Sequence, residues 1–330
     1  EVRRHNFQEV PCGLTEEQAL QEASRCLDCP KKPCVAGCPV EVDIPGFIAK
    51  VQEGDFIGAA RHIKQTNALP AVCGRVCPQE VQCEERCVRG KKAEPVAIGR
   101  LERFVADSER ATGDVAIPEG PASTGKKVAI IGAGPAGLAA AYQLRLRGHG
   151  VTIFDEHEEL GGMMRYGIPG FRTPREMLDA EIKRIIDLGV ETRLKTRIGS
   201  DVSFEQIEKD YDAIFMAMGA QAGRPLPVPG AEAPNCVTAV AFLRAFNEGR
   251  LQHVGNRVVV IGGGDTSIDV ATVARRLGNV SKSGTHDDRP ENVIAGHMAS
   301  DVASISAREG AEVVLVSRAT IDKMAANKHE

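Results

Sequence analysis

The sequence has no tryptophan, few aromatic residues of any kind and no excess of positive charge. Aromatic side chains make up 4% of its 330 residues, and the formal net charge at pH 7 is -4. Proteins that bind nucleic acid usually carry a basic surface and aromatic side chains on which bases stack. The composition therefore argues against polynucleotide binding.

Long apolar segments are also missing. No run of residues approaches the roughly 20 apolar positions that a membrane-spanning helix requires. The N-terminal segment EVRRHNFQEV lacks the apolar core of a signal peptide. The sequence therefore predicts a cytoplasmic protein with no membrane span.

Cysteine is nearly absent from the second part of the chain. Nine of the ten cysteines lie between Cys12 and Cys87, and only Cys236 lies beyond them. Apolar residues at three- and four-residue spacing predict several helices in the cysteine-rich part. We therefore expect an α-helical domain at residues 1–120. Cys12 and Cys236, which lie apart from the other cysteines, are interpreted as small core residues.

The other eight cysteines form two sets with short spacings. The first set is Cys26-x2-Cys29-x4-Cys34-x3-Cys38-Pro39, and the second is Cys73-x3-Cys77-Pro78-x5-Cys83-x3-Cys87. Disulfides are disfavoured in a reducing compartment, whereas structural zinc is a real alternative. The first set is a near variant of the ferredoxin pattern, in which the last cysteine of one run ligates the other cluster. We therefore expect two 4Fe-4S clusters.

A Gly- and Pro-rich link at residues 112–127 precedes a strand-like run that leads into a glycine-rich turn. Gly132, Gly134 and Gly137 have the GxGxxG spacing, and Asp155 ends the next predicted strand. Glycines at this spacing permit a tight turn, close approach of a pyrophosphate and packing of the helix on the strand, while the acid can accept ribose hydroxyls. These features predict a Rossmann-like domain at residues 126–250.

A second glycine-rich turn follows at RVVVIGGGDTSID, where Gly262, Gly264 and Ser267 occupy the corresponding positions. It predicts another Rossmann-like domain, at residues 251–330, and therefore a second dinucleotide. Two dinucleotides and two clusters describe an electron path. Nicotinamide carries hydride, flavin divides the electron pair, and clusters carry single electrons.

The motifs GAGPAG, ELGGMMRYGIPGFR, YDAIFMAMGA and GGGDTSID, together with the cysteine-rich domain, resemble the small (β) subunit of NADPH-dependent glutamate synthase. They are also similar to the N-terminal module of dihydropyrimidine dehydrogenase and to the large subunit of NADH-dependent ferredoxin:NADP oxidoreductases. The resemblance implies FAD at the first turn, contacted by Gly132, Gly134, Pro135, Ala136, Gly137, Asp155, Leu160, Gly161, Gly162, Met163, Arg165, Tyr166 and Ile168. It implies NADPH or NADH at the second turn, contacted by Gly262, Gly263, Gly264, Asp265, Thr266 and Ser267.

The resemblance also assigns the cluster ligands. One cluster takes Cys26, Cys29, Cys34 and Cys87, and the other takes Cys38, Cys77, Cys83 and Glu102, so that Cys73 is left outside. A surface carboxylate is the alternative interpretation of Glu102.

Arg318 follows the predicted strand AEVVLVS, where relatives usually carry an arginine pair that matches a ribose 2′-phosphate. Arg318 matches the first arginine of this pair, so we expect NADPH rather than NADH, although Ala319 stands in place of the second. A solvated arginine is the alternative interpretation.

Two departures from the family pattern are visible. Residues 282–310 have no counterpart in the usual members, and we interpret them as a solvated loop. The sequence stops before the segment with which relatives complete the flavin domain, so we expect a fragment that holds FAD less tightly than a longer protein.

The expected function is that of an NAD(P)H-dependent electron-transfer oxidoreductase. Its partner would be an amidotransferase-type large subunit, a ferredoxin or another redox protein or domain. The sequence identifies no catalytic residue. The alternative is a non-enzymatic iron-sulfur or zinc scaffold whose nucleotide-binding domains sense a cofactor.

Overall fold

The computed structural model describes residues 6–113, 117, 121–255, 257–277, 312–317 and 323–324. The chain divides into two compact units. The larger unit comprises residues 11–161 and 176–218, and the smaller unit comprises residues 1–10, 162–175 and 219–330.

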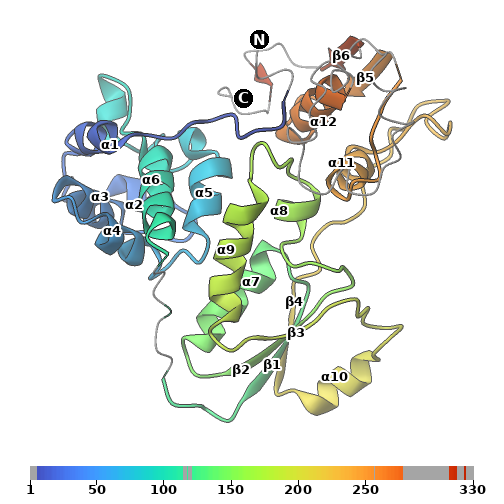
Figure 1. The fold of residues 1–330 in the computed structure, drawn as a ribbon, viewed down its shortest axis with the longest axis horizontal. Helices are drawn as coiled ribbons and strands as arrows, with labels where there is room; N and C mark the ends of the chain where they lie inside the picture. Colours follow the sequence, from blue (N-terminus) through green and yellow to red (C-terminus); the bar gives the residue numbers. More distant parts are fainter. Residues whose placement is uncertain are drawn as a thin grey trace. The chain divides into compact units, whose positions relative to one another are not determined.

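The first part of the larger unit is helical, as the apolar spacing predicts. Figure 1 shows its helices, coloured blue to teal, gathered into one bundle. The elements are α1 (Glu16–Ala23), α2 (Pro33–Ala36), α3 (Ile44–Gln52), α4 (Phe56–Ile63), α5 (Pro70–Val76), η2 (Gln79–Val81), η3 (Val88–Lys91) and α6 (Ile98–Ala111). Their apolar faces enclose one core that includes Phe47, Ile63 and Leu101.

Local sequence signals set the ends of these helices. Thr15 and Gln18 form a capping box at the start of α1, with reciprocal hydrogen bonds between side chains and main-chain amides. The apolar pattern from Ile44 to Ile63 is continuous, but Gly54 adopts a positive φ of 78° and Asp55 accepts a hydrogen bond from the Gly58 amide. The chain therefore forms two helices there, because a left-handed glycine ends one helix and an N-cap begins the next.

The second part of the larger unit contains a parallel sheet with the order β3-β2-β1-β4. Its strands are β1 (Lys127–Ile131), β2 (Gly150–Phe154), β3 (Glu191–Arg193) and β4 (Ala213–Met216), and its helices are α7 (Pro135–Arg145), α9 (Arg175–Ile186) and α10 (Phe204–Asp210). Parallel strands joined by helices form the Rossmann-like arrangement expected after the first glycine turn. The first glycine turn thus lies between the central strand β1 and α7.

Side chains of α7 and α9 bond to main-chain atoms of the helical bundle. The three bonds join Tyr142 Oη to the Lys64 carbonyl, Arg184 to the Ala68 carbonyl and Glu181 to the Ala71 amide. All three side chains are buried, so these bonds lie away from competing water. The segment that they hold leads directly into α5, which carries Cys73.

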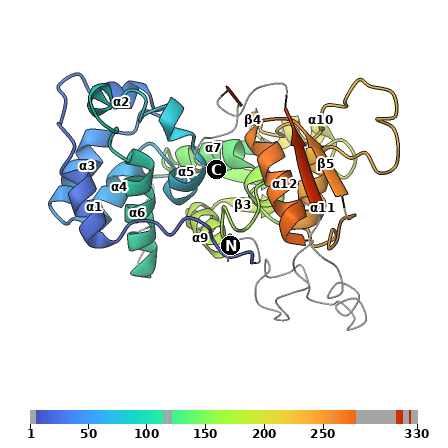
Figure 2. The same cartoon turned by 90° about the horizontal axis from the view of Figure 1, so that it is seen from above.

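The smaller unit contains the second glycine turn. Its elements are α8 (Met163–Tyr166), α11 (Ala239–Asn247), β5 (Arg257–Ile261), α12 (Asp265–Leu277) and β6 (Glu312–Val316). Strands β5 and β6 pair in parallel, and Figure 2 shows α12 beside them. Phe7, Phe171 and Phe246 pack together in the core of this unit, with ring centroids 5.7 Å apart for Phe7 and Phe246.

The predicted order of a helical domain followed by two Rossmann-like domains, which makes the protein α/β in class, is confirmed. The predicted domain boundaries at residues 120, 126 and 250 stay predictions. Among the residues that the structure describes, no helix is both long enough and apolar enough to cross a membrane.

Candidate cofactor sites

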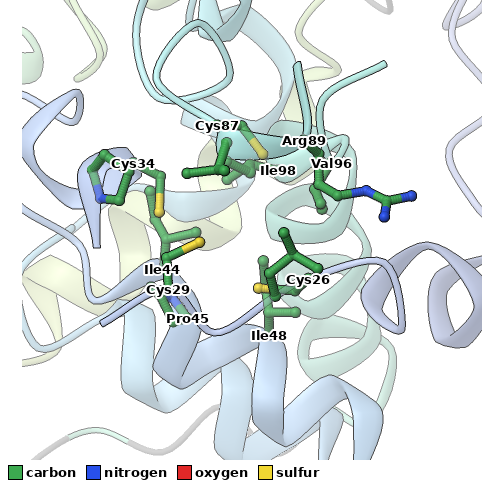
Figure 3. Close-up of a pocket in the computed structure, with 13 residues that line it drawn as sticks. Cys26, Cys29, Cys34, Ile44, Pro45, Ile48, Cys87, Arg89, Val96 and Ile98 are labelled. Atoms are coloured by element: carbon green, nitrogen blue, oxygen red, sulfur yellow. The ribbon is translucent and has the colours of Figure 1, made fainter. Parts of the chain in front are cut away.

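Four cysteine side chains meet at one cavity of the larger unit, which we call the first cysteine cavity. Cys26, Cys29, Cys34 and Cys87 line it, and Figure 3 shows their sulfur atoms around the same space. The structure thus brings together the first three cysteines of one run and the last cysteine of the other. This is the grouping that the family resemblance implies for one cluster.

The walls of this cavity are apolar. Ile44 and Ile48 of α3 lie on one side, and Val96 and Ile98 complete much of the rest. Burial raises the pKa of the Cys34 thiol to about 11 and also raises the pKa of Cys26. Metal binding would therefore have to displace protons from these thiols. Four thiols around a space with apolar walls fit a group with four thiolate ligands, such as an iron-sulfur cluster.

A single metal ion would need a tighter arrangement. In the described part of the chain, no group of three or more histidine, cysteine, aspartate or glutamate side chains is placed to hold one ion.

The second predicted ligand set is also partly assembled. Cys83 is 8% exposed, and burial raises the pKa of its thiol well above the ordinary value. Glu84, Glu102 and Cys38 add to this increase because their negative charges lie nearby. Three of the four predicted ligands, Cys38, Cys83 and Glu102, are therefore electrostatic neighbours. Cys77 lies at the end of α5, and its side chain is within hydrogen-bonding reach of Cys73.

Asn67, which sequence reasoning missed, joins this set to Cys73. Its Nδ2 donates a hydrogen bond of 2.7 Å to Oε1 of Glu102, and the Cys73 thiol lies 3.6 Å from its Oδ1. Burial is the main cause that raises the pKa of Glu102 well above its ordinary value, and the nearby Cys73 adds to the increase. Glu102 is half-buried rather than a solvated surface carboxylate. Its role as an iron ligand stays a prediction, as does the exclusion of Cys73.

The first glycine turn is tightly packed. Gly132 has a φ of 111°, and a Cβ at this position would lie 2.3 Å from the Ala217 carbonyl oxygen. A Cβ at Gly137 would lie 1.9 Å from the Gly132 carbonyl oxygen. Neither site can accept a side chain without displacing main chain. Gly134 is the N-cap of α7, and Pro135 and Ala136 begin its first turn, so this turn contains the helix N-terminus that a pyrophosphate site requires.

Asp155 is bound to this turn. Its Oδ2 accepts a hydrogen bond of 2.6 Å from the Ala133 amide, and its Oδ1 accepts one of 2.9 Å from the His157 amide. The His157 Nδ1 lies 2.7 Å from the same Oδ1. The carboxylate therefore ties the end of β2 to the glycine turn, a structural role that sequence reasoning did not predict. Its predicted contact with ribose stays a prediction.

The run predicted to lie along the flavin is divided between the units. Leu160 and Gly161 belong to the larger unit, where the Gly161 amide donates to the Ala133 carbonyl at 2.9 Å. Gly162, Met163, Arg165, Tyr166 and Ile168 belong to the smaller unit.

Arg175 fixes this second group of residues. Its guanidinium donates to the carbonyl oxygens of Arg165 and Ile168 and to the side-chain oxygen of Asn247. Asn247 in turn donates to the Tyr166 carbonyl at 3.1 Å. The main chain of the residues predicted to contact the flavin is therefore held in place by hydrogen bonds within the smaller unit.

The second glycine turn lies between β5 and α12. Gly262 has a φ of 144°, and a Cβ there would meet the Ser267 hydroxyl at 2.3 Å. A Cβ at Gly263 would lie 2.5 Å from Ser317 Oγ, whereas one at Gly264 would meet no heavy atom within 4 Å. Asp265 and Thr266 begin α12. The space beside Gly264 is open. A bound phosphate group could occupy it, whereas a side chain at this position would fill it.

Two sequence-based predictions concern residues that the structure does not describe, and a third is wrong. Arg318 and the solvated loop at residues 282–310 lie outside the described residues. The interpretation of Cys12 and Cys236 as core residues is wrong, because both side chains are exposed. Neither residue is a member of the buried apolar clusters around Phe47 and Phe246, and spacing alone gave no sign of this.

Comparison with known proteins gives two family matches. Residues 3–114 match the family described as dihydropyrimidine dehydrogenase domain II, 4Fe-4S cluster. Residues 126–326 match the family described as pyridine nucleotide-disulphide oxidoreductase.

Curated relatives cover most of the chain. The NAD-dependent dihydropyrimidine dehydrogenase subunit PreT of Salmonella typhimurium is 40% identical over 277 residues, covering 84% of this chain and 67% of the relative. The glutamate synthase [NADPH] small chain of Escherichia coli is 38% identical over 288 residues, covering 84% and 61%. The NADP(+)-dependent formate dehydrogenase subunit beta of Moorella thermoacetica is 43% identical over 270 residues, covering 74% and 38%. The chain thus spans about two thirds or less of the length of these relatives.

Proposed function

The chain belongs to the pyridine nucleotide-disulphide oxidoreductase family, and we propose that it passes electrons between NAD(P)H, FAD and two 4Fe-4S clusters. It is an NAD(P)H-dependent oxidoreductase with an iron-sulfur domain at its N-terminal side. The observation that carries the proposal is the first cysteine cavity, where four thiols from two sequence runs line one apolar space. It lies within the part of the chain that matches a 4Fe-4S family.

Two clusters are proposed because the eight closely spaced cysteines form two neighbourhoods. Cys26, Cys29, Cys34 and Cys87 would hold the first cluster. Cys38, Cys77, Cys83 and Glu102 would hold the second, and the charges of Cys38 and Glu102 near Cys83 support this set. A carboxylate in place of a thiolate would alter the net charge of the second cluster and thereby its reduction potential.

The two glycine turns are proposed to bind FAD and the nicotinamide dinucleotide, in that order. At the first turn, the N-terminus of α7 begins at Gly134, while Gly132 and Gly137 allow the main chain to approach closely. At the second, Gly264 leaves open space at the start of α12. Both helix N-termini would partly neutralise phosphate charge.

The residues of this chain bind the cofactors and shield them from water, and they do not themselves form or break covalent bonds. When bound, nicotinamide supplies hydride, flavin divides its two electrons, and clusters carry them singly. The apolar side chains around the first cysteine cavity exclude water. Tyr142, Glu181 and Arg184 hold the segment before α5 against the first Rossmann-like part, which fixes the second ligand neighbourhood relative to the first glycine turn.

The proposed partner is a redox subunit or domain that performs the substrate chemistry. The matched proteins are themselves named as subunits or chains of dihydropyrimidine dehydrogenase, glutamate synthase and formate dehydrogenase. These names support a partner but differ in their substrates. An amidotransferase-type large subunit and a ferredoxin both remain candidates, and NADPH is favoured over NADH by the predicted role of Arg318.

Cofactor content and flavin reduction test this proposal. Protein purified without oxygen should contain iron, sulfide and FAD, and addition of NADPH should bleach the flavin absorption. A colourless protein with stoichiometric zinc would instead support a scaffold. Iron and flavin that remain oxidised with both NADPH and NADH would contradict the proposed electron path.

A further inference from the structure

The first cysteine cavity contains one charged side chain among the residues that line it. Of the 13 lining residues, four are cysteines and eight are apolar, and the remaining one is Arg89. A guanidinium keeps its positive charge at any pH at which proteins are folded. The cavity thus combines apolar walls, four potential thiolates and one permanent cation.

The position of Arg89 is fixed by its own short helix. It follows Cys87 by two residues within η3, and its carbonyl oxygen accepts hydrogen bonds from the Lys92 and Ala93 amides at 3.1 and 3.0 Å. Figure 3 shows Arg89 at the side of the cavity, with its guanidinium directed away from the sulfur atoms. Arg89 is therefore placed to act through its charge, at a distance, rather than as a ligand.

Within the part of the chain that the structure describes, Arg89 has no ion-pair partner. Its Nε is buried and has no hydrogen-bond partner among the described residues, where no carboxylate forms an ion pair with it either. A partly buried cation without an opposite charge is costly, because its buried part has given up water. An anionic group in the adjacent cavity would remove that cost.

A cluster with four thiolate ligands is such a group. Its reduction adds one negative charge to a site whose apolar walls oppose any increase in charge. A nearby cation opposes that effect, and it does so more strongly in a low-dielectric surrounding than it would in water. Arg89 would therefore favour the reduced state over the oxidised state.

We propose that Arg89 is the counter-charge of the first cluster and raises its reduction potential. This inference rests on the proposed function, because it requires a cluster in the first cysteine cavity. In this proposal Arg89 acts on the cluster through its charge and is not a catalytic residue.

The test is a redox titration of the holoprotein monitored by electron paramagnetic resonance. The signal of the first cluster is identified as the one lost in Cys26→Ser. Arg89→Gln should lower its midpoint potential, so that the ratio of reduced to oxidised cluster at the wild-type midpoint falls roughly tenfold, which is about 59 mV for one electron. Arg89→Lys keeps the charge and should stay close to the wild-type potential.

Arg86 provides a matched control. It lies three residues earlier, its side chain is 65% exposed, and its Nε is 3.8 Å from Glu85. Because solvent screens an exposed charge, Arg86→Gln should leave the potential unchanged. An equal shift in Arg86→Gln and Arg89→Gln would overturn the inference, since it would reflect net charge alone.

The outcomes separate this inference from the proposed function. If Cys26→Ser removes no signal, the cluster site itself is wrong. If Cys26→Ser removes a signal whose potential is the same in Arg89→Gln and in the wild type, only the role of Arg89 is wrong. If Arg89→Gln does not incorporate iron, Arg89→Lys is tested for iron content instead, because it keeps the charge. If Arg89→Lys also lacks iron, the shape of the side chain and not its charge is what the site requires, and the proposal is overturned.

Discussion

Asn67 donates a hydrogen bond of 2.7 Å from its side-chain amide to Oε1 of Glu102. Asn67 lies in the loop before α5 and Glu102 lies in α6. The bond holds the carboxylate near Cys83, whose thiol pKa is raised in part by the charge of Glu102. Because the bond engages one carboxylate oxygen, the other can ligate iron. The same asparagine accepts from Cys73 at 3.6 Å, so Cys73 is the competing candidate for the last ligand of the second cluster.

Replacement of Glu102 should therefore affect one cluster and spare the other. We expect Glu102→Ala to alter or remove the paramagnetic signal of the second cluster, while the signal lost in Cys26→Ser persists. Cys73→Ser should disturb neither. If both signals survive in Glu102→Ala and one disappears in Cys73→Ser, then Cys73 is the ligand and the assignment carried over from relatives is wrong.

Tyr142 should contribute to stability through its hydroxyl group. Its Oη donates a buried hydrogen bond of 3.0 Å to the Lys64 carbonyl and so joins α7 to the helical bundle. Tyr142→Phe removes the donor and leaves a buried carbonyl without this partner, which should cost about 1 kcal/mol. The midpoint of urea unfolding measures the loss.

Tyr211 serves as the control for this change. Its ring packs edge-on against Phe154 with centroids 5.9 Å apart, and its hydroxyl forms no hydrogen bond within the described part of the chain. Tyr211→Phe should leave the midpoint unchanged. Equal midpoints for Tyr142→Phe and the wild type would show that the hydroxyl does not stabilise the joint.

Glu181 should make stability depend on pH. Burial raises the pKa of this carboxyl from 4.5 to about 7, against the opposing effect of Arg184 and Lys64. Between these two values the folded protein holds a proton that the unfolded chain has lost, so stability falls as the pH rises through this window. The loss is of the order of 1–3 kcal/mol.

Glu181→Gln removes the titration and retains an oxygen that can accept from the Ala71 amide. The urea midpoint of this variant should vary less between pH 5 and pH 7.5 than that of the wild type, and at pH 7.5 it should be the higher of the two. An identical dependence on pH in both proteins would rule out Glu181 as the titrating group.

Gly264 should matter for cofactor binding and not for folding. A Cβ at this position meets no heavy atom within 4 Å, so Gly264→Ala should fold with wild-type stability. The added methyl group would occupy the space proposed for the pyrophosphate, and we expect the KM for NADPH to rise by about tenfold or more. Steady-state flavin reduction and thermal unfolding measure the two effects.

Gly255→Ala is the matched control in the same unit. Its Cβ would lie 3.9 Å from the nearest atom, outside the glycine turn, so neither KM nor stability should change. A wild-type KM in Gly264→Ala would show that the dinucleotide does not approach the main chain there.

Sequence alone predicted the parts of this protein whose signals are local. The spacing of Cys26, Cys29 and Cys34, and the glycines before α7 and α12, each fall within one short segment, and the structure keeps them together. The helical bundle was also predictable, because its apolar periodicity is local. The break between α3 and α4 is explained by two adjacent residues, Gly54 and Asp55, so its signal is also local.

Contacts between distant residues could not be predicted in this way. Asn67 meets Glu102 across 35 positions of sequence, and Tyr142 meets Lys64 across 78, with no pattern to relate them. The hydrogen bond from the Ala133 amide to Asp155 was not predicted for another reason, since the glycine-turn pattern had already given this residue a role at the ribose. The exposure of Cys12 and Cys236 was missed because residue type indicates burial only on average.

The central claim is that electrons from the nicotinamide dinucleotide reach the cluster in the first cysteine cavity. The most direct measurement is freeze-quenched electron paramagnetic resonance of the anaerobic holoprotein after mixing with NADPH, with visible absorption followed in parallel. Flavin bleaching should be accompanied by a reduced iron-sulfur signal that is absent in Cys26→Ser. Bleached flavin with no cluster signal, or the same signal in Cys26→Ser, would contradict the account.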